Sequence, residues 1–189
     1  GPVLLYNRVT REENPMRCVE FKNSTGLTLE GGPVTVLEAG RYVGEAMLNT
    51  MKPDEVRLVP YCVELGVHVQ MSLVLHGENV YRVIARRGEL RASFKQIFQT
   101  NYEFNNKSDA VQIVILEHPR SASDCILVDT PPVHETTEKY WRFRFIIAPN
   151  QVTRFEVKAE HTQWKWIRLT AASDQDILVW IGQKYLDAK

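Results

Sequence analysis

Residues 21–48 read FKNSTGLTLEGGPVTVLEAGRYVGEAML and contain five of the chain's ten glycines, Gly26, Gly31, Gly32, Gly40 and Gly44. A phosphate-binding loop requires G-x-x-x-x-G-K-[ST] between a strand and a helix, or G-x-G-x-x-G at the start of a helix, and neither spacing occurs here. Gly26 instead follows Asn-Ser-Thr and Gly40 follows Ala, as turn glycines do, and Gly31-Gly32-Pro33 is expected to separate two strands. The apolar residues between these glycines alternate with polar ones. The stretch therefore predicts β-strands joined by tight turns and excludes a nucleotide loop.

The same alternation continues through most of the chain. In residues 90–104 most even positions are apolar and most odd positions are polar, with one irregularity near Gln96. This pattern is typical of a half-buried strand. Turn signals such as KPDE and APNQ recur along the sequence, and no helix-length segment separates the short runs rich in Val, Ile, Phe, Tyr and Thr. Because a parallel sheet needs long crossover connections, we predict an all-β fold of antiparallel β-sandwiches.

We expect this fold to be divided into two stacked β-subdomains. The first covers residues 1–76, and the second, an immunoglobulin- or fibronectin-like sandwich, covers residues 77–171. The boundary follows from the turn-rich segment LHGEN at residues 75–79, which has predicted strands on both sides. One continuous sandwich is the alternative. The two halves do not resemble each other, so no internal repeat is predicted.

The C-terminal segment SDQDILVWIGQKYLDAK changes to helical spacing. Ser173 is a suitable N-cap, and Ile177, Ile181 and Tyr185 recur four residues apart. Residues 172–189 are therefore predicted to begin a helix, which either continues beyond Lys189 or docks back on the sheet as a short helix. The chain begins with Gly-Pro and no methionine, as after removal of a cleaved tag, so we expect a piece excised from a longer protein.

Composition excludes several classes of function. Lys plus Arg equals Asp plus Glu at 23 each, so the chain as a whole has no field that attracts nucleic acid or an anionic membrane. No apolar run is long enough to span a membrane. Cys18, Cys62 and Cys125 lie far apart without CxxC spacing, and the histidines are scattered, so we expect free buried thiols, no metal site and no cofactor.

One loop holds residue types that nucleophilic catalysis would use. His118, Asp124 and Cys125 flank this loop, but no G-x-S-x-G motif or other nucleophile signature accompanies them. A hydrolase or protease component using Cys125 is therefore the last of three functional hypotheses. We predict no enzymatic activity.

Two surface candidates remain. The segment RVIARRGELR places Arg86 and Arg87 at a hairpin tip, where phosphate contacts are one reading and a solvated hairpin is the expected one. Trp164 and Trp166 lie on one strand face, and we expect them to pack in the core against Trp180 of the tail helix. If the rings are exposed instead, these two tryptophans with Arg86 and Arg87 form the candidate interaction surface.

Asn23-Ser24-Thr25 and Asn106-Lys107-Ser108 match the glycosylation sequon. Such matches are common by chance and matter only in a secreted eukaryotic protein. We therefore expect no function for them.

Residues 21–69 follow the pattern N-x-[ST], G-P-V-x-V, G-x-[YF]-x-G-E and then a P-x-[DE] turn. NYEFNNKSDAVQIVILEHPR and YWRFRFIIAPNQVTRFEVKAE add a strand pair ending in His-Pro-Arg and a strand, Pro-centred turn and strand. Over roughly residues 17–160 the chain thus resembles a poorly characterised β-rich family that includes the mucoidy-inhibitor-A-like proteins. The resemblance implies a β fold, often beside coiled coils, and a helical continuation past Ser173, but no catalytic residues.

The leading functional prediction is a non-enzymatic β-sandwich module of a larger protein that mediates protein–protein interaction or self-association. Its surface is the Trp164 and Trp166 face or an exposed sheet edge. The first alternative is a carbohydrate-binding module that stacks sugar rings on Trp164, Trp166 and Tyr140 or Trp141. No nucleic acid partner is expected, and the compartment is left open, with the cytoplasm favoured.

Overall fold

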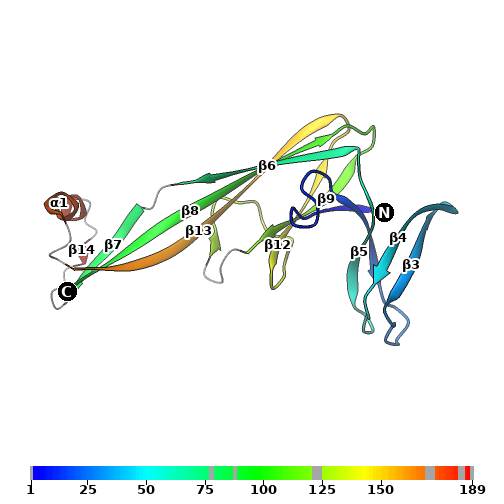
Figure 1. Cartoon of the computed structure of the whole chain (residues 1–189), viewed down its shortest axis with the longest axis horizontal. Coiled ribbons are helices and arrows are strands. Elements are labelled where there is room, and N and C mark those ends of the chain that lie inside the picture. Colours follow the sequence, from blue (N-terminus) through cyan, green and yellow to red (C-terminus); the bar gives the residue numbers. More distant parts are fainter. Residues whose placement is uncertain are drawn as a thin grey trace. The chain divides into compact units, whose positions relative to one another are not determined.

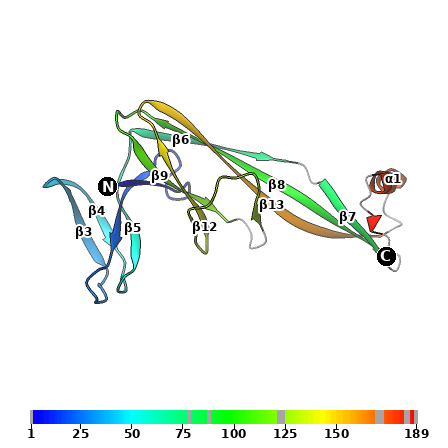
Figure 2. The same ribbon diagram turned by 180° about the vertical axis from the view of Figure 1, so that it is seen from behind.

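The computed structural model describes residues 2–76, 79–86, 89–120, 125–168, 173–182 and 186–187. The protein is mostly β, with 65% of its residues in strands, three sheets and a single small helix near the C-terminus of the described chain. The predicted all-β class with a short C-terminal helix is confirmed. Figures 1 and 2 show the elements from opposite sides.

The first sheet is curled and mixed. In spatial order its strands are β11 (Glu135–Thr136), β12 (Tyr140–Ile147), β9 (Gln112–Pro119), β1 (Val3–Tyr6), β2 (Met16–Lys22) and β5 (Val56–Val63). Neighbouring strands are antiparallel except β1 and β9, which pair in parallel with Leu4 opposite Val114. No hairpin joins β1 to β9, so nothing in the local sequence fixes their relative direction.

A separate two-stranded sheet contains most of the glycine-rich stretch. Its strands are β3 (Gly32–Glu38) and β4 (Arg41–Leu48), and they pair in antiparallel fashion. Ala39 and Gly40 connect them with φ values of 47° and 77°, the left-handed conformation that a two-residue hairpin turn requires. The turn interpretation is confirmed for Gly26 and Gly40, which have φ values of 74° and 77°, whereas Gly32 and Gly44 lie within β3 and β4.

The second large sheet contains the two longest strands. In spatial order it comprises β10 (Ile126–Leu127), β13 (Gln151–Arg168), β8 (Glu89–Asn106), β7 (Asn79–Arg86) and β14 (Leu186–Asp187), and β6 (Val67–Leu75) also pairs with β8. The strand predicted over residues 90–104 is confirmed within β8, which continues through Gln96 without a break. Its even-numbered residues Leu90, Ala92 and Phe104 are buried, as the alternation predicts.

The tail forms a short helix that docks on this sheet. Helix α1 (Asp174–Gly182) begins where the Ser173 cap predicts, and the Ile177 amide donates to the Ser173 carbonyl at 3.1 Å. Ile177 packs against a buried cluster on β7 and β8. The cluster consists of Val83, Leu90 and Ala92. Strand β14 follows the helix and pairs with β7 in parallel, so the expected helix does not continue through β14.

By their internal contacts the residues form two compact units of three segments each. The first unit comprises Gly1–Met71, Tyr102–Pro119 and Pro131–Phe155, and the second comprises Ser72–Asn101, Arg120–Thr130 and Glu156–Lys189. Strands β8 and β13 each contribute one part to both units. The division into contiguous subdomains of residues 1–76 and 77–171 stays a prediction.

The first unit has an aromatic core. The ring of Phe104 lies 5.6 Å from that of Tyr6 and 5.2 Å from that of Phe145, both edge to face. Phe155 stacks on Phe145 at 4.7 Å and lies 5.1 Å from Phe143. Edge-to-face and offset contacts stabilise aromatic pairs beyond the area that they bury. The cluster thereby joins β1, β8, β12 and β13 within this unit.

A buried asparagine closes the end of β2. The Nδ2 group of Asn23 donates to the Leu27 carbonyl at 2.7 Å. It also donates to the carbonyls of Met51 and Lys52, at 3.2 and 3.0 Å, in the turn before β5. The Oδ1 atom accepts from the amide and the hydroxyl of Thr25, so the carboxamide is fully hydrogen-bonded although Asn23 is 0% exposed.

Asn106 closes the end of β8 in the same way. Its Nδ2 group donates to the carbonyls of Ala110 and Ala148 at 2.9 and 3.0 Å, and its Oδ1 atom accepts from the amide and hydroxyl of Ser108. Asn106 is also 0% exposed. The two sequon matches are therefore one structural motif used twice. This repeat was not predicted, because the two segments have only the Asn-x-Ser/Thr residues in common.

We expect Asn106→Ala to lower the free energy of unfolding by about 2–3 kcal/mol, because it removes the hydrogen bonds of a fully buried carboxamide to the Ala110 and Ala148 carbonyls. Urea denaturation followed by circular dichroism measures the effect. Asn49→Ala is the control, since Asn49 is exposed, and it should change stability by less than about 0.5 kcal/mol. Equal midpoints for the two variants would show that the carboxamide is not a structural requirement.

Gly44 allows β4 to approach β5. A β-carbon at Gly44 would lie 2.5 Å from the Tyr61 carbonyl oxygen, which belongs to the backbone and cannot rotate away. We therefore expect Gly44→Ala to destabilise the protein by about 1–3 kcal/mol, as overpacking does. Gly32→Ala is the matched control, because a β-carbon there meets nothing within 4 Å. Thermal melts of both variants test this difference, and a Gly44→Ala melt at or above that of the control contradicts it.

Candidate functional site

Trp164 and Trp166 are exposed on the outer face of β13. Their side chains are 53% and 54% exposed, and their ring centroids lie 6.1 Å apart at an interplanar angle of 82°. The expectation that both pack in the core is therefore wrong. The side chain of Trp180, their expected partner, lies outside the described residues.

The alternation of β13 explains this exposure. Phe155 is half-buried and Val157 and Ala159 are buried, all at odd positions, whereas both tryptophans occupy even positions. Because successive side chains of a strand point to opposite faces, continuing this count along β13 places the two rings on the polar face. The sequence alternation predicts this exposure, but only if residues 151–168 form one continuous strand.

Arg91 of β8 lies over the exposed pair. Its guanidinium carbon is 4.6 Å from the centroid of the Trp164 ring, a cation–π contact. The Nε atom is shielded from solvent and has no hydrogen-bond partner, and no carboxylate among the described residues forms an ion pair with Arg91. The Trp164 ring thus contacts the Arg91 guanidinium, and no described carboxylate compensates its positive charge.

Ordered polar pairs continue this face along β8 and β13. Lys95 Nζ lies 2.8 Å from Glu160 Oε1 and 5.2 Å from the centroid of the Tyr81 ring. The hydrogen bond to Glu160 raises the pKa of Lys95. Gln99 donates to Glu156 at 2.6 Å. We call the surface formed by six of these side chains the Trp164 face. It comprises Tyr81, Arg91, Lys95, Glu160, Trp164 and Trp166.

The structure places the other two predicted surface residues only in part. Arg86 ends β7 and lies opposite Glu89 in the β7–β8 register, but its side chain lies outside the described residues. Arg87 lies outside them entirely. Tyr81 and Lys95 were not predicted as site residues. They reach this face through the register between neighbouring strands, which the sequence of one strand does not determine.

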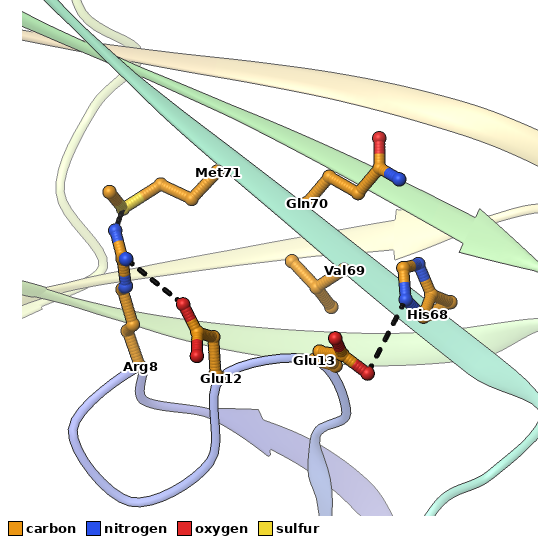
Figure 3. Close-up of a pocket in the computed structure, with 7 residues that line it drawn as sticks. All are labelled: Arg8, Glu12, Glu13, His68, Val69, Gln70 and Met71. Carbon is orange, nitrogen blue, oxygen red and sulfur yellow. Dashed lines mark hydrogen bonds and ion pairs between the residues drawn. The ribbon is translucent and has the colours of Figure 1, made fainter.

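An open polar pocket in the first unit is drawn in Figure 3. It has a volume of about 330 Å³ and is lined by Arg8, Glu12, Glu13, His68, Val69, Gln70 and Met71. Arg8 forms an ion pair with Glu12 at 3.1 Å and donates to the Met71 sulfur at 3.2 Å. His68 Nε2 lies 3.9 Å from Glu13 Oε2. The charges of Arg8 and Glu12 compensate each other.

Glu117 anchors a buried polar network in the first unit. It accepts from Asn7 Nδ2 at 2.8 Å and from two nitrogens of Arg142 at 2.9 and 2.7 Å. Arg142 also donates to Glu135 at 2.8 Å, and these hydrogen bonds raise its pKa against the opposing effect of burial. The buried Glu117 carboxylate is thus paired with a cation and hydrogen-bonded at both oxygens, as a structural ion pair requires.

His118 is buried between two aromatic rings. The Tyr102 hydroxyl lies 2.8 Å from His118 Nδ1, and the Trp141 ring stacks on the imidazole at 6.0 Å. Burial lowers the pKa of His118 from 6.5 to about 4 and raises that of Tyr102. At neutral pH the imidazole is therefore uncharged and enclosed. This arrangement is a packed core, not a reactive histidine.

The Cys18 and Cys62 thiols are not activated. Burial raises the pKa of Cys18 to about 12 and also raises the pKa of Cys62, so both are protonated at neutral pH. Cys125 is buried, and Asp124 lies outside the described residues. The catalytic hypothesis for His118, Asp124 and Cys125 stays untested as a whole, but its histidine is occupied by Tyr102.

Within the described ranges, no three His, Cys, Asp or Glu side chains gather closely enough to hold a metal ion. No helix in the part of the chain that the structure describes is long and apolar enough to cross a membrane. The Trp164 face thus remains the most developed candidate site.

We expect stability to fall between pH 6.5 and about 4 because of His118. In this range the unfolded chain binds a proton at His118 and the folded chain does not, so the stabilisation present above pH 6.5 is lost as the pH falls. The difference in pKa corresponds to about 3 kcal/mol. Urea midpoints measured from pH 7.5 to 4 test this, and His118→Gln should flatten the profile relative to the wild type. His134→Gln, at an exposed position, should leave the profile unchanged.

Comparison of the chain with protein-family models, curated proteins and solved structures finds no match. The resemblance to the mucoidy-inhibitor-A-like proteins therefore stays a prediction. The proposed function therefore rests on the exposed aromatic and cationic groups of the Trp164 face.

Proposed function

We propose that the protein is a non-enzymatic β module that binds another protein, or a second copy of itself, through the Trp164 face. One observation supports this proposal above all: Trp164 and Trp166 are more than half exposed on a sheet face where Arg91 lies on Trp164 and Tyr81 contacts Lys95. Trp, Tyr and Arg are the residues most enriched where protein–protein binding energy concentrates.

The face is also pre-organised. It stands on β8 and β13, two adjacent strands of one sheet, so the backbone need not be ordered on binding. Arg91 is already stacked on Trp164, and Lys95 is already paired with Glu160. Side chains that are fixed before association lose less conformational entropy when the partner arrives.

Carbohydrate binding is the second candidate, and the exposure of both rings favours it. Stacking on a sugar needs a free, flat ring face. Here the two rings are nearly perpendicular, and Arg91 lies against the face of Trp164. The pair therefore offers edges and one open ring more than a continuous platform, which suits apolar side chains of a protein better than a glycan chain.

The proposal predicts that Trp164→Ala/Trp166→Ala abolishes a specific interaction without unfolding the chain. Binding partners captured by the full 189-residue chain are identified, and the interaction is then measured with the purified partner by calorimetry. We expect at least a tenfold loss of affinity, since two hot-spot aromatics are removed. Self-association, measured by sedimentation, should decrease in the same variant if the partner is a second copy.

The matched control is Tyr42→Ala/Met47→Ala, which removes two exposed apolar side chains from β4. It should bind as the wild type does. Equal binding by both double variants contradicts the proposal. A glycan-array signal that is lost only in the tryptophan variant would instead support the carbohydrate candidate.

A further inference from the structure

We propose that the Trp164 face takes an acidic linear segment of its protein partner. The segment would place a carboxylate on Arg91 and an apolar side chain against the exposed edges of Trp164 and Trp166. This inference rests on the proposed function and adds to it the chemical class of the bound segment.

The uncompensated charge of Arg91 is the first step. Arg91 is partly buried beneath Trp164, its Nε atom is shielded without a partner, and none of the described carboxylates pairs with it. The Nη groups are then the donors that an incoming anion can reach. A partly desolvated guanidinium gains most from a carboxylate, which forms charge-assisted and often bidentate hydrogen bonds with it.

The balance of charge around the tryptophans is the second step. Lys95 is neutralised by Glu160. Arg168 ends β13 two residues after Trp166, on the same face by alternation, and it is exposed without an ion pair to the described residues. Among the described side chains, Glu89 is the nearby acid on β8. The three cations Arg91, Lys95 and Arg168 still outnumber the two acids Glu89 and Glu160, and this excess of positive charge complements an acidic partner.

The third step distinguishes a peptide from single-stranded nucleic acid, whose phosphates are also anions. A nucleic acid platform combines parallel stacking rings with an extended basic groove. Here the rings are perpendicular, and Lys95 and Lys158 are paired with Glu160 and Glu156, so they form no extended basic groove. The whole chain has no net charge. A short acidic and apolar peptide fits this mixed surface better.

A random 12-residue peptide library displayed on phage, panned on the full chain, tests the inference. We expect selected peptides to carry Asp or Glu next to an aromatic or large aliphatic residue. A synthetic peptide with the selected sequence should bind at least tenfold more weakly to Arg91→Gln and to Trp164→Ala/Trp166→Ala. Arg41→Gln, an exposed arginine on β4, is the matched control and should bind normally.

A double-mutant cycle identifies the contact itself. Replacing the peptide's acid by its amide should also weaken binding tenfold to the wild type, but should have little further effect on Arg91→Gln, because both changes remove the same ion pair. Circular dichroism of each variant verifies that it is folded. Arg91→Glu should select peptides with Lys or Arg in place of the acid.

Three results would overturn the inference. Peptides that depend on Trp164 and Trp166 but carry no acid would refute the acidic segment and leave the proposed function standing. Peptides that bind equally to the tryptophan variant would refute both. Tighter binding of a fluorescein-labelled dT20 oligonucleotide than of any selected peptide would assign Arg91 to a phosphate partner.

Discussion

The carboxamides of Asn23 and Asn106 connect strand ends that lie far apart in the sequence. Asn23 binds carbonyls 28 and 29 residues away, directly before β5, and Asn106 binds a carbonyl 42 residues away at the end of β12. The β2–β5 pairing begins beside the first of these contacts, and the β9–β12 pairing begins beside the second. Each buried amide thus links the turn after its own strand to the place where a non-local pairing starts.

Local properties of this fold were predictable, because local physics determines them. Alternation in residues 90–104 identifies β8 and its buried even positions, Ala39-Gly40 identifies a hairpin, and Ser173 identifies the start of α1. The parallel pairing of β1 with β9 was not predictable in the same way, because it depends on the partner strand and not on either sequence alone. The role of the two sequon matches was missed for a similar reason. More than half of the hydrogen bonds of the two carboxamides go to residues outside the motif.

The candidate site shows the same limit. Trp164 and Trp166 were identified as residues, but their large apolar area suggested the core, and only the parity of β13 indicates the opposite face. Arg91 belonged to an arginine-rich hairpin in the sequence, and pairing of β8 with β13 changes its meaning by placing it on Trp164. Hydrophobicity alone therefore assigns a strand residue to the wrong face when a sheet presents its aromatic side chains to solvent.

The burial of Asn23 and Asn106 also limits when either side chain could be glycosylated. An oligosaccharide transferred to Nδ2 of Asn23 or Asn106 would replace a hydrogen atom that now contacts backbone carbonyls inside the protein. The folded chain is therefore a poor acceptor, and a modified chain could not close these turns. A sugar at either position would therefore show that the chain was unfolded when it was modified. It would also show that the first sheet did not form completely afterwards.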